Sequence, residues 1–199
     1  IILFAVPSVF VRETASKVRE FLPENQIIVD VAKGIERKTH LMLSEVISTE
    51  IKRDGNHDNV KVVALSGPTH AEEVAVDLPT TIVSACEDED IAKFVQDIFM
   101  NDNLRVYTNN DVKGVELCGA LKNIVALAAG ISNGLGYGDN AKAALITRGM
   151  SEIKRLGLKM DCLESTFEGL SGIGDLIVTA TSEHSRNYRA GRLIGQGYS

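Results

Sequence analysis

The chain has 199 residues, of which 44% are hydrophobic and 24% charged, so it can bury a core in one large domain or in two modest ones. Its net charge of −6 argues against broad contact with nucleic acid, which needs an excess of clustered lysine and arginine. The 3 cysteines and 4 histidines lack the spacing of metal ligands, which predicts no structural metal and a reducing compartment.

The apolar segments point to a soluble protein. No apolar run approaches the roughly 20 residues that span a bilayer, and no basic segment precedes the apolar start, so we expect a cytoplasmic protein without membrane insertion. Residues 1–6 already have the pattern of a buried strand, with neither an initiator Met nor a polar lead-in. We therefore expect the chain to begin within a fold, with a segment missing upstream.

Helices and strands then alternate. Strands are predicted at residues 1–6, 27–31, 60–65, 79–85 and 104–107, and helices at residues 8–22, 41–52 and 90–100. This alternation predicts a parallel or mostly parallel α/β sheet with both faces covered. Past Asn110 the chain becomes rich in Ala, Leu and Gly, with long helical stretches and no convincing strand. We predict a domain boundary near residue 109, between an α/β domain at 1–108 and an all-helical domain at 109–199.

Residues that directly follow predicted strands are candidates for a site, because ligands of open α/β sheets bind beyond the carboxyl ends of the strands. Ser8 follows the first strand and is suited to cap the next helix. Lys33 follows the second strand, beside Gly34, which permits close backbone approach. A solvated lysine is the alternative at that position.

The third strand end reads Ser66-Gly67-Pro68-Thr69. Thr69 and Glu72 have the spacing of a capping box at a helix start, which accounts for both side chains. Glycine and proline before them also suit backbone amides that hold an anion at a helix N-terminus. The two interpretations have equal weight.

Lys122 is the sharpest signal in the helical half. It lies on an apolar stripe that also contains Val115, Cys118, Val125 and Ala129. A lysine on a buried stripe is costly unless it is paired or functional, although its stem can also reach solvent. In the functional interpretation, burial and a second cation such as Lys33 lower its pKa and suit it to proton exchange with a carbonyl or hydroxyl oxygen.

Two later segments fit an anionic substrate. Ser185, Arg186 and Asn187 open a predicted helix with hydroxyl, guanidinium and amide donors, where the helix dipole also favours a phosphate. Ordinary capping explains the same residues. Asp175, in Gly172-Ile173-Gly174-Asp175, is suited either to orient a lysine or to cap a helix. The glycine clusters at 134–138 and 169–174 follow helices and are not dinucleotide fingerprints, and no GxGxxG is present.

Seven short motifs follow one another along nearly the whole chain. They are Ala5-Val6-Pro7-Ser8, Ala32-Lys33-Gly34-Ile35-Glu36, Ser66-Gly67-Pro68-Thr69, Leu121-Lys122-Asn123-Ile124-Val125-Ala126, Leu145-Ile146-Thr147-Arg148-Gly149, Gly172-Ile173-Gly174-Asp175-Leu176 and Ser185-Arg186-Asn187. Each is weak alone, but seven in the right order and spacing are highly specific. Together they resemble the motif set of bacterial NAD(P)-dependent glycerol-3-phosphate dehydrogenases.

The resemblance implies the remainder of an NAD(P)-binding Rossmann-like domain followed by a helical substrate domain. It implies reduction of dihydroxyacetone phosphate to sn-glycerol 3-phosphate with NAD or NADP, for glycerophospholipid synthesis, by a homodimer. Lys122 would be the catalytic proton acceptor, Lys33 would contact substrate and cofactor, and Ala71 and Arg186 would contact cofactor. The other substrate-binding residues would be Gly67, Thr69, Asp175, Ser185, Arg186 and Asn187, together with Lys122 itself.

The family pattern extends beyond both ends of this chain. The glycine-rich turn upstream and further cofactor contacts downstream of Ser199 are absent from it, and the preference for NADH or NADPH is not readable. Two alternatives stay open. A reductase of the same two-domain type with another substrate should lack the full Ser185-Arg186-Asn187 set, and a non-catalytic module would fit the missing cofactor turn.

Overall fold

The computed structural model describes residues 1–198, and its first half is a five-stranded sheet. The strands lie in the order in which they occur in the chain: β1 (Ile2–Phe4), β2 (Ile27–Asp30), β3 (Lys61–Ser66), β4 (Thr80–Ala85) and β5 (Leu104–Asn109). Neighbouring strands are parallel except β3 and β4, which pair antiparallel with Ala64 opposite Ala85. The predicted, mostly parallel sheet is confirmed.

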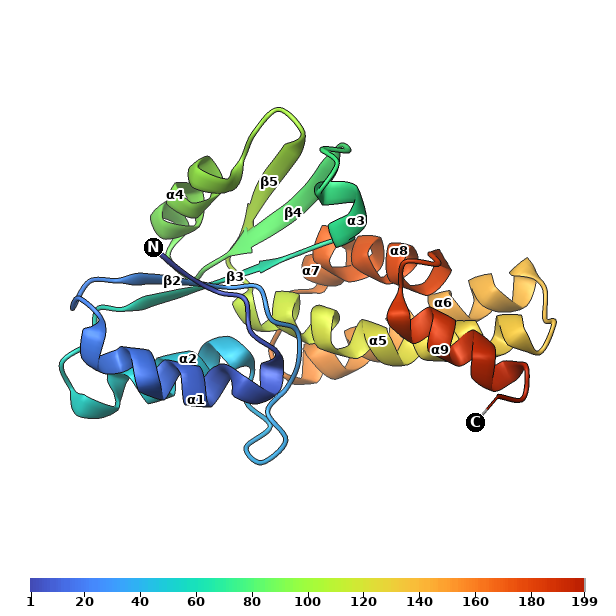
Figure 1. The fold of residues 1–199 in the computed structure, drawn as a ribbon, viewed down its shortest axis with the longest axis horizontal. Coiled ribbons are helices and arrows are strands. Elements are labelled where there is room, and N and C mark those ends of the chain that lie inside the picture. The colour runs from blue at the N-terminus through green and yellow to red at the C-terminus, as the bar shows by residue number, and fades with distance from the viewer. Residues whose placement is uncertain (199) are drawn as a thin grey trace.

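Helices cover both faces of this sheet (Figure 1). The helices α1 (Val11–Val18) and α2 (Leu43–Ile51) lie on one side, and α4 (Glu89–Phe99) lies on the other, while the short α3 (Ala71–Val74) follows β3. Strand β2 shows the cause, because successive side chains of a strand point to opposite faces. Ile28 packs into the core under α1 and α2, whereas Val29 packs into the core under α4.

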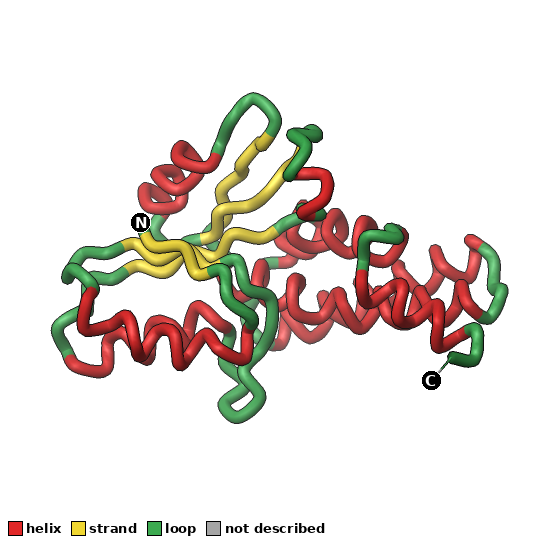
Figure 2. Tube along the Cα trace, in the orientation of Figure 1, coloured by secondary structure: helices red, strands yellow, loops and turns green. Residues whose placement is uncertain are grey.

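The second half consists of helices and loops in the described part of the chain (Figure 2). The long helix α5 (Val112–Gly134) is packed against its neighbours by a core that includes Leu117, Val125 and Leu176. Val115 of α5 also packs on Ala64 of β3, which joins the helical half to the sheet. The remaining helices are α6 (Asp139–Lys159), α7 (Glu164–Glu168), α8 (Asp175–Thr181) and α9 (Arg186–Gly195), with a π-helical turn at Leu170–Gly174.

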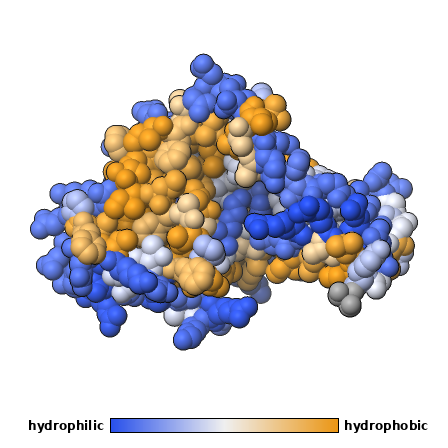
Figure 3. Space-filling view, viewed as in Figure 1, coloured by the Kyte–Doolittle hydropathy of each residue, from blue (hydrophilic) through white to orange (hydrophobic). Residues whose placement is uncertain are grey.

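Helix α5 corrects the expectation that no segment is long and apolar enough to span a bilayer. By length and composition it qualifies, with a mean hydropathy of 1.5 over its best window, but 56% of that window is buried inside the protein. The charged side chains of Glu116 and Lys122 are buried on it, and both hold polar partners within the fold. On the surface seen in Figure 3, apolar side chains gather over the sheet half, and the region of α9 is more hydrophilic.

The structure shows neither the helix cap predicted at Ser8 nor the capping box that was one of the two interpretations of Thr69 and Glu72. Ser8 begins a 3-10 turn that precedes α1, and its hydroxyl caps no helix. Helix α3 begins only at Ala71, after His70, and no side chain caps it, so Thr69 and Glu72 form no capping box. The hydroxyl of Thr69 donates instead to the carbonyl oxygen of Gly67, at 3.3 Å.

Helices α5 and α9 touch backbone to backbone at glycines. A Cβ atom at Gly130 would lie 2.1 Å from the carbonyl oxygen of Tyr188, and one at Gly191 would lie 2.1 Å from that of Leu127. No side chain fits at either position without moving a helix. The approach fixes α9, and therefore the segment at its start, relative to α5.

We predict that Gly191→Ala destabilises the protein by about 1–3 kcal/mol, because the added methyl group meets backbone that cannot turn aside. Gly174→Ala is the matched control, since a Cβ there has its nearest neighbours at 3.8 Å in helical backbone. The control should leave stability unchanged or raise it by up to about 1 kcal/mol. Denaturant unfolding measures both, and equal midpoints for the two variants would contradict the close approach.

Candidate active site

Two lysines meet one buried aspartate where the sheet joins the helical half. Asp175, at the start of α8, is 1% exposed and accepts hydrogen bonds from both ammonium groups. Lys33 follows β2 and donates to Asp175 Oδ2 at 2.8 Å, while Lys122 of α5 donates to Oδ1. Of the two roles considered for Asp175, the structure thus shows contact with lysines, and Gly174 stands at the N-cap of α8.

Lys122 is 7% exposed, so of the two interpretations of the apolar stripe the structure shows the buried lysine. The pKa of its ammonium group is lowered to about 8, chiefly because burial strips it of water and next because Lys33 repels it, while Asp175 acts in the opposite direction. This agrees with the interpretation that burial and a second cation lower its pKa. The group can therefore gain and lose a proton near neutral pH.

Thr179 is a member of this cluster that the sequence analysis missed. It is 5% exposed, and its hydroxyl accepts a hydrogen bond from the Lys122 ammonium group at 2.8 Å. Thr179 lies four residues after Asp175, so the two share one face of α8. That spacing was the available signal, because a polar residue one turn after a buried carboxylate faces the same neighbours.

The turn before α8 places Asp175. Residues Leu170–Gly174 form a π-helical turn, a departure that often marks functional sites. A Cβ atom at Gly172 would lie 2.2 Å from the carbonyl oxygen of Phe167, so only glycine fits. The hydroxyl of Ser171 donates to the carbonyl oxygen of Ser66 at 3.1 Å and ties the turn to the end of β3.

The loop after β3 reaches the lysines through Gly67. The carbonyl oxygen of Gly67 accepts from the Lys33 ammonium group at 3.3 Å and from the hydroxyl of Thr69 at the same distance. Gly67 itself packs on β4, where a Cβ would lie 3.0 Å from Cα of Ile82. The structure therefore brings together four predicted site residues directly, and Thr69 through Gly67. The four are Lys33, Gly67, Lys122 and Asp175.

The remaining predicted residues lie at the margin, without a hydrogen bond to either lysine. Ser185 caps α9, and its hydroxyl accepts from the backbone N–H of Tyr188 at 3.2 Å. Ala71 and Arg186 are exposed, and Asn187 is half-buried. The rings of His70 and His184 lie 5.7 Å apart, which brings the segment before α9 close to the loop that follows β3.

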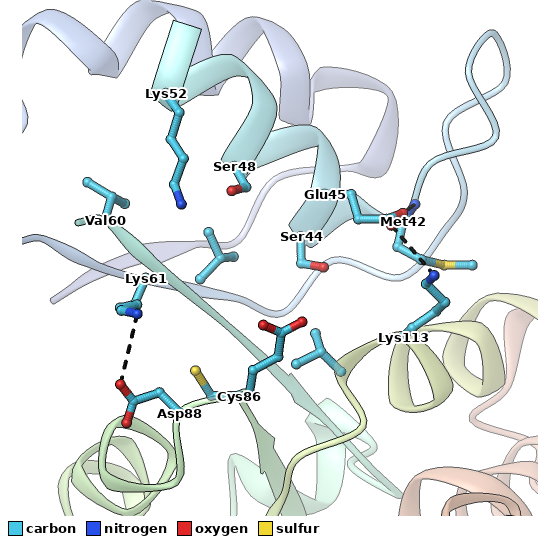
Figure 4. A pocket seen from close by; sticks show the side chains of 13 residues that line it. Met42, Ser44, Glu45, Ser48, Lys52, Val60, Lys61, Cys86, Asp88 and Lys113 are labelled. Atoms are coloured by element: carbon cyan, nitrogen blue, oxygen red, sulfur yellow. Dashed lines mark hydrogen bonds and ion pairs between the residues drawn. The ribbon is translucent and has the colours of Figure 1, made fainter. Parts of the chain in front are cut away.

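A separate cavity of about 250 Å³ lies between α2, β3 and the start of α5 (Figure 4). Its lining includes Ser44, Lys61 and Lys113, and none of the predicted site residues. Beside it, the buried carboxylate of Glu116 accepts from the backbone N–H of Ser44 at 2.9 Å and from its hydroxyl. Burial raises the pKa of Glu116 to about 7. This cavity is a different feature from the lysine cluster.

Comparison with known proteins shows which family this chain is similar to. Residues 1–92 match the model of the NAD-dependent glycerol-3-phosphate dehydrogenase N-terminus, and residues 111–199 match that of the C-terminus. The chain is 70% identical over its full length to glycerol-3-phosphate dehydrogenase [NAD(P)+] 2 of Lactobacillus delbrueckii subsp. bulgaricus, and 56% identical to the corresponding enzyme of Clostridium acetobutylicum. It spans 59% and 58% of these two proteins.

Solved structures agree. Glycerol-3-phosphate dehydrogenase from Coxiella burnetii superposes with a TM-score of 0.92 at 39% identity, over 100% of this chain and 59% of that one. GPD1 from Saccharomyces cerevisiae gives 0.85 at 30% identity, over 98% and 57%.

A mostly parallel sheet with helices on both faces and a cation at a strand end places the chain in the class of Rossmann-like α/β folds, here joined to a helical half with a buried lysine. Within that class, this chain belongs to the NAD-dependent glycerol-3-phosphate dehydrogenase family.

Proposed function

We propose that the protein is an NAD(P)-dependent sn-glycerol-3-phosphate dehydrogenase that reduces dihydroxyacetone phosphate, with Lys122 as its proton-transferring residue. The observation that carries the proposal is the buried Lys122 ammonium group, held by Asp175 and Thr179 with its pKa lowered to about 8. Reduction of a ketone needs a proton at the new hydroxyl oxygen. A lysine that exchanges its proton near neutral pH meets that need.

The residues fit the nicotinamide end of the cofactor. The Lys33 side chain is 25% exposed at the carboxyl end of β2, where such sheets bind dinucleotides, and Ala71 and Arg186 are exposed, so all three are open to a ligand. Residues 1–198 contain no glycine-rich turn between a strand and a helix. Lys33, Ala71 and Arg186 are therefore proposed to contact the nicotinamide end of the cofactor, and no residue of this chain is assigned to its pyrophosphate.

The reaction needs few groups from the protein. Reduced nicotinamide, when bound, supplies the hydride. As negative charge develops on the C2 oxygen, Lys122 donates a proton to it and Lys33 stabilises the charge. Asp175 holds both ammonium groups in place, and the buried site tolerates the neutral amine that Lys122 becomes.

The phosphate group is assigned to the start of α9. Ser185, Arg186 and Asn187 offer donors at a helix N-terminus, where the dipole favours an anion. The loop after β3, which carries Gly67 and Thr69, comes near this segment where the rings of His70 and His184 lie 5.7 Å apart. We further propose a homodimer in the cytoplasm whose product serves glycerophospholipid synthesis. The boundary between the two domains is proposed near residue 109, where β5 ends.

We predict that Lys122→Ala abolishes reduction of dihydroxyacetone phosphate while the protein stays folded, because it removes the buried ammonium group whose pKa is lowered to about 8 and which is assigned to donate the proton. The measurement is loss of reduced-nicotinamide absorbance with the full-length gene product, beside the 199-residue chain. Lys113→Ala, which removes a partly exposed lysine of the same helix, is the control and should keep full activity. Normal turnover by Lys122→Ala would remove the residue from the mechanism, and a folded but silent full-length protein would point to another substrate.

For Arg186→Ala we expect weaker binding of the phosphate substrate, because a charge-assisted hydrogen bond contributes roughly 1.5–3 kcal/mol. The KM for dihydroxyacetone phosphate should rise accordingly, by roughly 10- to 150-fold. Arg189→Ala, one turn further along α9, is the matched control, since Arg189 is also exposed. Equal effects of the two substitutions would remove Arg186 from the phosphate site.

The pH dependence should follow Lys122. Reduction requires the ammonium form, so kcat/KM for the ketone should be level below about pH 8 and fall tenfold per pH unit above it. Oxidation of glycerol 3-phosphate requires the neutral amine and should show the opposite limb near the same pH. Initial rates in both directions from about pH 6 to about pH 10 provide the measurement. Profiles without a limb of either sign near pH 8 would contradict the assignment.

A further inference from the structure

Lys33 belongs to a short hairpin that connects β2 with α2. Residues 33–42, here called the Lys33 hairpin, are closed by a bridge between Ile35 and Met42, and by a hydrogen bond from the N–H of Glu36 to the carbonyl oxygen of Leu41 at 3.0 Å. The hairpin is the blue loop at the lower edge of Figure 1. Glu36 stands at its base, three residues from the Lys33 side chain that contacts Asp175.

An arginine of α1 forms hydrogen bonds with Glu36 at the base of the hairpin. Arg12 of α1 donates through Nε and Nη2 to the two carboxylate oxygens of Glu36, both at 2.7 Å, and through Nη1 to Glu50 of α2 at 3.1 Å. Thr39 of the hairpin donates to the same Glu36 carboxylate at 2.5 Å. Hydrogen bonds from Arg12, followed by that from Thr39, lower the pKa of Glu36 to about 2. The paired geometry fixes distance and orientation together.

A second contact holds the Lys33 hairpin at Gly34, the residue after Lys33. A Cβ atom at Gly34 would lie 2.8 Å from Cβ of Ser8, so the hairpin and the segment before α1 touch directly. Ile35, the next residue, packs on the core of the helical half. The backbone that carries Lys33 is therefore held between α1 and the helical half, and the fork of Arg12 and Glu36 is its polar anchor.

We propose that Arg12 and Glu36 are positioning residues, which hold the Lys33 ammonium group beside Asp175 and Lys122 for the reaction. The inference rests on the proposed function, because it assumes that Lys33 acts on the substrate. Arg12 and Glu36 contact neither lysine and act through the backbone of the hairpin. If the anchor is lost, Lys33 moves away from the reacting oxygen and from Lys122.

The expected signature differs from plain loss of stability. Charged and polar groups face Lys122 from two segments, Lys33 from the hairpin and Asp175 and Thr179 from α8. Lys33 lowers the pKa of Lys122, so a displaced Lys33 raises that pKa. Since reduction needs the ammonium form, the alkaline limb of the pH profile should then move to higher pH. A merely structural residue would leave the limb in place.

The test compares Arg12→Met and Glu36→Gln with the wild type in the full-length protein. Both should lower kcat for ketone reduction by roughly 10- to 100-fold, the effect of a small misplacement, and both should move the alkaline limb upward. The double variant should lose no more than either single variant, because the two residues form one contact. Arg19→Met is the matched control. Arg19 donates to Glu50 as Arg12 does, but it does not contact Glu36, so its variant should keep the wild-type limb.

Two readouts do not depend on turnover. Hydrogen exchange of the Glu36 and His40 amides, which are bonded within the hairpin, should be faster in Arg12→Met and Glu36→Gln and unchanged in Arg19→Met. The pH dependence of Lys122 acetylation by acetic anhydride, read by mass spectrometry, should move upward in the same two variants.

Each outcome decides the proposal. Unchanged exchange in Arg12→Met would overturn the anchor, and faster exchange with an unmoved Lys122 titration would overturn the positioning role. If the wild type reduces no ketone, the proposed function fails. Hydrogen exchange and the pH dependence of Lys122 acetylation then still decide whether the contact between Arg12 and Glu36 positions Lys33.

Discussion

The structure depends on one carboxylate that two ammonium groups share. Asp175 lies 142 residues from Lys33 and 53 from Lys122, so the contact forms only when the sheet, α5 and α8 are all in place. Removing such charges from water is costly, and the cost is offset only when every partner is correctly placed. The apolar packing around the cluster supplies that placement, because Val115 joins α5 to β3 and Leu176 holds α8 in the core. Burial and pairing are therefore two aspects of one constraint.

Glycines set the distances that this constraint requires. Gly67 lets the end of β3 lie on β4, Gly172 lets the π-helical turn close before Asp175, and Gly130 with Gly191 lets α9 approach α5. In each case the neighbouring atom is backbone, which cannot turn aside as a flexible side chain can. Contacts between backbone atoms thus help to hold the polar residues of the site in place. A methyl group at Gly130, Gly172 or Gly191 would lie 2.1–2.2 Å from a backbone oxygen and would force the helix or turn to move.

The sequence predicted the features that depend on residues close together in the chain. The apolar patterns predicted the strands and the helix α5, because each depends on neighbours along the chain, while they left open whether Lys122 is buried or reaches solvent. The role of Asp175 stayed open, since its partners are distant in sequence and only the fold decides between a cap and an ion pair. The cap expected of Ser8, and the capping box that was one of two interpretations of Thr69 and Glu72, were wrong because a 3-10 turn precedes α1 and α3 begins only at Ala71. The spacing of Thr179 to Asp175 places both on one face of α8, but the sequence did not show that this face contacts Lys122.

The opposing effects on Lys122 explain why the site needs both halves of the chain. Burial in the helical half alone would favour the neutral amine, and Asp175 alone would hold the ammonium form well above neutral pH. Lys33, delivered from the sheet by its hairpin, adds repulsion, and the balance brings the pKa to about 8. A lysine in this state can give a proton in one direction of a redox reaction and take it back in the other. Under the proposed function, the reversibility expected of a dehydrogenase therefore depends on where the Lys33 hairpin places one charge.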